Sequence, residues 1–179
     1  MEKLTTKKGL RVALRILRKP DLQAILDLQD FVCESLPDKT LLIPASEQFL
    51  SNHLEVKQGA VYGIFHKNEL IAYSILHFPG NDEDNLGVDI GLSKDELNKV
   101  AHLEIQMVHP DFRGNNFQNI LNDVMLKEAK EKGYLHLLCT VSPDNIVSHK
   151  NLEKIGMIVM KTKFKYGGNK RDIMYMRLK

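Results

Sequence analysis

Apolar and polar residues alternate along several short segments of the chain, which is the period-two pattern of β-strands. A polar turn at 67–69 separates two of these segments and predicts a hairpin, and a turn at 167–169 predicts a second, closing hairpin. The run at 134–141 is mostly apolar, which is typical of a buried central strand. The segments predicted as strands are 12–17, 60–65, 70–78, 101–108, 134–141, 157–164 and 171–178.

Other segments repeat apolar residues at intervals of three and four, the spacing of one helix face. Ser142 and Pro143 have the residue types of an N-cap and a first helical position, and Ser93 with Glu96 has the spacing of a capping box. The loop-like stretch PGNDEDN precedes that box. The predicted helices run from about 20 to a point before Pro37, from about 46 to 58, from about 116 to 133 and from 142 to 156.

This order of elements predicts one α/β domain over residues 1–179, with a central mixed β-sheet of about seven strands flanked by about four helices. A chain of 179 residues can bury a sound core without disulfides or metals. The formal charge of +2 argues against a dedicated nucleic-acid binder, which would carry a concentrated basic face.

Cysteine usage and hydropathy bear on the compartment. Cys33 and Cys139 show neither Cys-x-x-Cys nor zinc-ligand spacing, and the histidines lack H-x-x-x-H spacing, so we expect reduced thiols and no metal site. No apolar run approaches the roughly 20 residues that span a bilayer. We therefore expect a cytoplasmic protein with no membrane partner. The two-fold dimer is the commonest homo-oligomer, so a homodimer is the base-rate expectation.

The segment VHPDFRGNNFQNI (108–120) joins a predicted strand to a predicted helix. The first N–H groups of a helix have no acceptor within it, and the helix dipole favours an anion there. Gly114 would let the backbone approach a ligand closely, and Arg113 adds a positive charge. The segment is therefore either an ordinary turn or a cradle for a phosphate. No nucleotide-triphosphate or dinucleotide motif is present.

A second segment, SPDNIVSHKNLEKIGM, follows one strand later. Together the two segments resemble the GNAT superfamily of N-acetyltransferases, which pairs V-x-P-x-x-R-G-x-G-x-G/A with N-x-x-A-x-x-L-Y-x-x-x-G-F. The element order is that of the same family, so the resemblance covers nearly the whole chain. The residues at the positions of the pattern are Val108, Pro110, Arg113 and Gly114 in the first segment, and Asn145, Ser148, Asn151, Leu152, Gly156 and Met157 in the second.

The resemblance implies a GNAT-type domain that binds acetyl-CoA. Backbone groups at the end of the strand would pair with the pantetheine arm, the turn and first helical residues would hold the pyrophosphate, and the second segment would line the same groove. The residues implied are Gln106, Met107 and Val108 for the arm, Arg113, Gly114, Asn115, Asn116, Phe117 and Gln118 for the pyrophosphate, and Asn145 and Ser148 for the groove.

Three departures from the family pattern bear on binding and chemistry, two in the turn and one in the later helix. Asn116 and Gln118 stand where the family has Gly and Gly or Ala. Asn tolerates a left-handed backbone, whereas Gln118 is bulky where close approach matters. Leu152 replaces the tyrosine that many relatives use as a general acid, and a leucine cannot deliver a proton.

Amide formation from a thioester needs a deprotonated amine and a route to protonate the departing thiolate. Glu104 is the first candidate base, because it lies on the same strand face as Gln106 and Val108, and some relatives carry a glutamate there. The alternative is a polar residue on a partly solvated face. His102, two residues earlier on that face, is a weaker candidate.

Tyr166 could replace the missing acid, although buried packing is the alternative role, and the thiolate could also leave through water. Cys139 is expected to be an inert buried thiol. The closing hairpin carries a basic cluster that is either a solvated edge or an attraction for an acidic acceptor or the 3′-phosphate of the coenzyme. Its members are Lys161, Lys163, Lys165, Lys170 and Arg171.

The expected function is therefore transfer of an acetyl group from acetyl-CoA to a primary amine by direct attack. The acceptor is an amine-bearing small molecule or protein that the motifs do not identify. The alternative is a catalytically weak or inactive GNAT-fold protein that binds acyl-CoA as a regulatory ligand, and a plain interaction domain is a third interpretation.

Overall fold

A computed structural model describes residues 2–55 and 58–179. Within these residues the chain forms eight strands and six α-helices, so the predicted α/β class with a mixed sheet is confirmed. The strand order is β1-β2-β3-β4-β5-β6-β8-β7. Two compact units are distinguished, residues 1–39, 43–75 and 105–121 in the first and residues 40–42, 76–104 and 122–179 in the second. A single domain over 1–179 stays a prediction.

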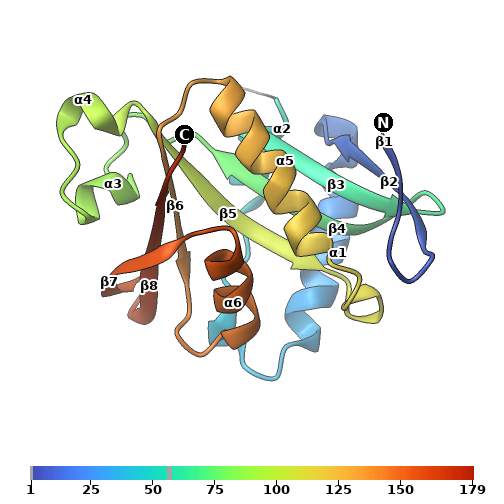
Figure 1. Ribbon diagram of the computed structural model, residues 1–179. Coiled ribbons are helices and arrows are strands. Elements are labelled where there is room, and N and C mark those ends of the chain that lie inside the picture. Colours follow the sequence, from blue (N-terminus) through green and yellow to red (C-terminus); the bar gives the residue numbers. More distant parts are fainter. Residues whose placement is uncertain (1, 56–57) are drawn as a thin grey trace. The chain divides into compact units, whose positions relative to one another are not determined.

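The first unit contains the N-terminal strands and helices, in blue to cyan in Figure 1. Its hairpin turns through Lys67 and Asn68, which both have positive φ, as a tight two-residue hairpin turn requires. The elements are β1 (Glu2–Thr5), β2 (Arg11–Ile16), α1 (Leu22–Ser35), α2 (Glu47–Leu54) and β3 (Gly59–His66), with most of β4 (Glu69–His77), the end of β5 (Val100–Val108) and the start of α5 (Phe117–Glu131).

The second unit contains the start of β5, the rest of α5 and the C-terminal elements. Its sheet joins β5 to β6 in parallel and β6 to β8 antiparallel, and α3 packs its Leu86 against Val100, Leu138 and Ile173. The remaining elements are α3 (Leu86–Asp89), α4 (Lys94–Leu97), β6 (His136–Val141), α6 (Ile146–Lys154), β7 (Ile158–Lys165) and β8 (Asn169–Arg177).

Two elements were not predicted, and one predicted boundary was wrong. Residues 2–5 form a strand, β1, that pairs with β2, so the chain starts with a hairpin. Residues 86–89, which follow the predicted loop, form α3 with Asn85 as its N-cap. The last helix starts at Ile146 and not at 142, because Asn145 caps it while Ser142 accepts a hydrogen bond from Asp144 N–H in the preceding turn.

Other boundaries agree with the pattern. The capping box of Ser93 and Glu96 is present at α4. Ser46 caps α2, which ends at Leu54; the predicted continuation to about 58 includes residues 56 and 57, which lie outside the described residues. Across the part of the chain that the structure describes, no helix is long and apolar enough to cross a membrane.

Candidate functional site

Strand β5 ends beside the buried core of the first unit. Met107 is almost fully buried and its sulfur accepts a hydrogen bond of 3.4 Å from the Tyr73 hydroxyl, whereas Gln106 and Val108 are partly exposed. His109 N–H donates to the Ile71 carbonyl at 2.8 Å, which ties the strand end to β4. These contacts therefore fix the position at which the turn begins.

The turn that follows has two left-handed residues with one residue between them. Gly114 has φ +76° and Asn116 has φ +66°, so the asparagine adopts the conformation for which it was expected to substitute for glycine. Asn115 braces the turn, since its side chain donates to the Phe112 carbonyl at 3.0 Å and accepts from the Thr6 hydroxyl at 3.2 Å. A turn of this kind gives a concave backbone of the type that binds anions.

Helix α5 starts directly after this turn. The Asn116 carbonyl accepts from Ile120 N–H at 3.1 Å, so the backbone N–H groups between these residues precede the first intrahelical bond. Phe117 anchors the helix start with a fully buried side chain, and Gln118 is partly exposed. The Asn116 side chain accepts a hydrogen bond from Asn119. The backbone at this end of the helix is thus held in place by side-chain contacts.

Two positive charges belong to the turn, and sequence reasoning found only one. Arg113 is exposed. The Lys8 ammonium lies 3.1 Å from the position that a Cβ on Gly114 would occupy, so the lysine side chain reaches over the glycine. Lys8 stands in the connection between β1 and β2, a hairpin that the pattern did not predict, so no local signal pointed to it.

Asn145 and Ser148 belong to the second unit and bond to each other. The Asn145 side-chain oxygen accepts from Ser148 N–H at 3.2 Å, as the N-cap of α6. Leu152, one turn later, is buried. The position at which the family has a tyrosine is therefore occupied by a core side chain that cannot donate a proton. The Asn145 side chain therefore has a structural role at the start of α6.

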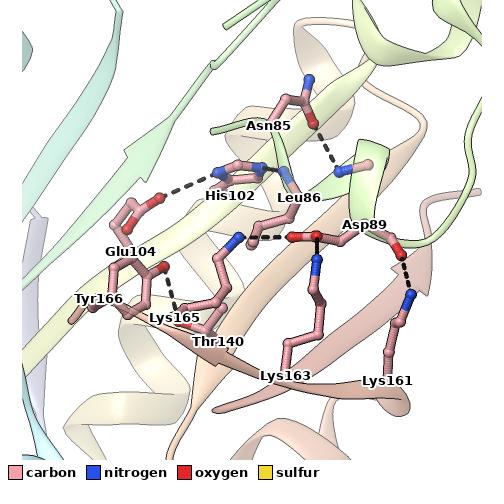
Figure 2. A network of polar contacts seen from close by, with 11 residues as sticks. Asn85, Leu86, Asp89, His102, Glu104, Thr140, Lys161, Lys163, Lys165 and Tyr166 are labelled. Carbon is pink, nitrogen blue, oxygen red and sulfur yellow. Dashed lines mark hydrogen bonds and ion pairs between the residues drawn. The ribbon is translucent and has the colours of Figure 1, made fainter. Parts of the chain in front are cut away.

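Glu104 and His102 lie side by side on β5 in the second unit, as the period of two predicts. Glu104 Oε1 is 3.2 Å from His102 Nδ1, and the Glu104 side chain is 28% exposed. His102 is buried, and its Nε2 accepts from Leu86 N–H at 3.2 Å. Figure 2 shows the ring between the two partners.

Tyr166 lies at the end of the closing hairpin near Glu104. Its hydroxyl and that of Thr140 are 3.2 Å apart, and its side chain is 47% exposed, so the alternative of buried packing is wrong. Partial burial raises the pKa of the Tyr166 phenol, the hydrogen bond with Thr140 opposes this, and the negative charge of Glu104 raises it again. A phenol with a raised pKa stays protonated at neutral pH and has a proton to deliver.

Cys139 is buried in β6 with its sulfur 3.8 Å from the Met157 sulfur. Burial raises the pKa of the Cys139 thiol, with a further rise from Glu104, so the thiolate needed for covalent chemistry does not form near neutral pH. Among residues 2–55 and 58–179, no group of three or more histidines, cysteines or acids is placed to hold a metal ion.

The basic cluster of β7 is not a plain solvated edge. Lys163 and Lys165 hold the two carboxylate oxygens of Asp89 at the end of α3, the latter at 2.7 Å, and Lys161 donates to the Asp89 carbonyl (Figure 2). Burial raises the pKa of Asp89, but the hydrogen bonds from Lys163 and Lys165 together outweigh it, so the pKa lies below its usual value. This lysine clamp, Lys161, Lys163 and Lys165 on Asp89, ties α3 to β7.

Comparison with protein families gives a match over most of the chain. The sequence profile described as the acetyltransferase (GNAT) family matches residues 22–157. Comparison with curated protein sequences gives no match.

Solved structures with the same fold include several acetyltransferases. One from Streptococcus pneumoniae, of the GNAT family, has a TM-score of 0.72 at 11% identity and covers 94% of this chain and 99% of its own. The ribosomal-protein-S18-alanine N-acetyltransferase of Escherichia coli has a TM-score of 0.69 at 15% identity, covering 93% and 94%. The yncA protein of Salmonella typhimurium, solved with its cofactor acetyl-CoA, has a TM-score of 0.69 at 14% identity, covering 94% of each chain. At these identities the likeness shows the fold alone.

Proposed function

Because this chain belongs to the acetyltransferase (GNAT) family, we propose that it transfers an acetyl group from acetyl-CoA to a primary amine by direct attack. The proposal rests on the turn before α5. This turn combines a left-handed backbone at Gly114 and Asn116 with the positive charges of Arg113 and Lys8. The alternative of an inactive acyl-CoA binder rested on Leu152 and Gln118. The family match does not favour this alternative.

The turn fits a diphosphate for three physical reasons. Gly114 presents no Cβ, and the Lys8 ammonium beside that position ends a flexible side chain, so a phosphate can contact the backbone and the ammonium together. The start of α5 offers backbone N–H groups and the positive end of the helix dipole. Two cationic side chains then add favourable charge for a phosphate. We assign the pyrophosphate to residues 113–118 and the pantetheine arm to backbone groups of residues 106–108. A contact of Asn145 and Ser148 with the coenzyme stays a prediction.

Acetyl-CoA supplies a thioester whose carbonyl carbon is open to attack by an amine. Glu104, whose Oε1 lies 3.2 Å from His102 Nδ1, accepts the proton of the attacking amine. Tyr166 delivers a proton to the sulfur as the carbon–sulfur bond breaks, in place of the tyrosine that Leu152 replaces. One C–N bond forms and one C–S bond breaks, so the products are an amide and the free thiol of the coenzyme.

The proposed acceptor is a primary amine on a small molecule or on a protein. The Escherichia coli neighbour acts on an alanine of a ribosomal protein according to its name, but 15% identity does not carry that acceptor to this chain. The acceptor must bring its nitrogen to Glu104 and Tyr166, which lie on β5 and after β7.

Thermal unfolding with acetyl-CoA, CoA, ATP and NAD, each at about 1 mM, tests the cofactor. A ligand at about 100 times its dissociation constant stabilises the protein by about 2.7 kcal/mol. We expect a shift with the two coenzyme A species alone, and no shift with either would refute the cofactor assignment. Release of free thiol from acetyl-CoA with a panel of amines then tests turnover. Binding without thiol release from any amine would favour the inactive binder.

A further inference from the structure

His102 is a buried side chain with both ring nitrogens in hydrogen bonds. Its side chain is 2% exposed, with Nε2 3.2 Å from the Leu86 nitrogen and Nδ1 3.2 Å from Glu104 Oε1. Leu86 is the first residue of α3, and Glu104 lies two residues further along β5 (Figure 2). The imidazole therefore connects a backbone amide to the carboxylate that we propose as the base.

The two partners determine where the ring carries its proton. A backbone N–H can only donate, so Nε2 must offer its lone pair to Leu86. A neutral imidazole with a lone pair on Nε2 carries its proton on Nδ1, and this N–H then points at Glu104. A doubly protonated ring would face the Leu86 N–H with a second N–H and lose that bond.

The Leu86 amide is held firmly in its place. Asn85, itself buried, accepts from Gly87 N–H at 2.9 Å and donates to the Gly80 carbonyl at 2.7 Å and the Leu97 carbonyl at 3.2 Å. The Leu86 side chain packs in the core of the second unit. At the other end of α3 the lysine clamp on Asp89 holds the helix to β7. The amide that sets the state of the ring is thus anchored on both sides.

We propose that His102 is a positioning residue for the acetyl-transfer reaction, held as the Nδ1–H tautomer by the first amide of α3 so that it orients Glu104. This inference rests on the proposed function. The N–H that His102 donates favours the ionised carboxylate, which is the form that accepts a proton, and limits the rotation of its side chain. Because Nε2 is engaged with Leu86 and the ring is buried, His102 is not the base itself.

Two conservative variants separate positioning from a purely structural role. In His102→Asn the amide lies near the position of Nδ1, so it keeps a donor for Glu104 and loses the contact with Leu86. In His102→Gln the amide lies near the position of Nε2, so it keeps an acceptor for Leu86 and loses the donor for Glu104. Each variant gives up one of the two hydrogen bonds, which makes them matched controls for stability.

We expect His102→Asn to keep kcat within about threefold of wild type, and His102→Gln to lower it by at least about tenfold. KM for acetyl-CoA should not change in either, and their melting temperatures should agree. An equal loss of kcat in both variants, in proportion to a loss of stability, would overturn the positioning role. Wild-type kcat in both would overturn it too, while the proposed function would stand.

Nitrogen-15 NMR of the histidine side chains provides a readout that needs no turnover. With the resonances assigned through His102→Gln, wild-type His102 should show a protonated Nδ1 and an unprotonated Nε2 near neutral pH. The opposite tautomer, or a doubly protonated ring, would overturn the inference. If the tautomer is as expected but no amine releases thiol from acetyl-CoA, the proposed function fails and the positioning role falls with it.

Discussion

Replacement of Gly114 by alanine tests the turn before α5 most directly. Gly114 has φ +76°, and a residue with a Cβ in this left-handed conformation costs about 1–2 kcal/mol. The new Cβ would lie 3.1 Å from the Lys8 ammonium, the end of a flexible side chain that can move away. We therefore expect Gly114→Ala to fold, with a melting temperature lowered by roughly 2–4 °C for each kcal/mol lost.

The effect on acetyl-CoA should exceed the effect on stability. Relief of the strain rotates the backbone that we assign to the pyrophosphate and removes the open approach to it. Loss of one hydrogen bond to a charged group costs about 1.5–3 kcal/mol, which corresponds to about tenfold to about 150-fold weaker binding. Titration calorimetry of acetyl-CoA on the folded variant measures this difference.

Gly133→Ala is the matched control. Gly133 follows α5 with φ +79°, and nothing lies within 4 Å of the position of its Cβ, so it carries the same backbone strain at the other end of the helix. We expect a similar loss of melting temperature with wild-type affinity. Equal affinity in wild type and Gly114→Ala would refute the pyrophosphate assignment. Equal weakening in both variants would trace the effect to stability.

Three further predictions concern charge and proton transfer. Arg113→Ala should weaken acetyl-CoA binding about tenfold in calorimetry with little change in melting temperature, because Arg113 is exposed, and unchanged affinity would argue for an ordinary turn. Tyr166→Phe should lower kcat about a hundredfold at constant acetyl-CoA affinity, whereas unchanged kcat would mean that the thiolate leaves through water. Asp89→Asn should cost about 1–3 kcal/mol near pH 7, a range reduced because Lys163 is 40% exposed. The folded pKa of Asp89 lies below its ordinary value, so its contribution to stability is present above about pH 4 and is lost as the pH falls through the folded pKa. Denaturation of wild type and Asp89→Asn near pH 7 and in acid should therefore show a smaller difference in acid. An equal difference at the two pH values would contradict the clamp.

The spacing of apolar residues was sufficient to predict an element when that element depends only on residues close together in the sequence. The alternation over 101–108 and the apolar run over 134–141 predicted β5 and β6, because a half-buried or buried strand imposes that spacing. The cap of α6 was misplaced by three residues, since Ser142 and Asn145 both have capping side chains and only the turn between them decides which one serves. Strand β1 is too short to show a period.

The family resemblance, most of the order of elements and the turn in which Asn116 replaces a glycine could be predicted without coordinates, because these depend on residues close together along the chain. Tertiary packing was needed to place Lys8 over Gly114, the β7 lysines on Asp89, and the Leu86 N–H on His102 Nε2. Lys165 and Asp89 are 76 positions apart, and no periodicity records a contact of that range. Such contacts arise when packing brings distant segments together, and they determine the state of the groups that we expect to do the chemistry.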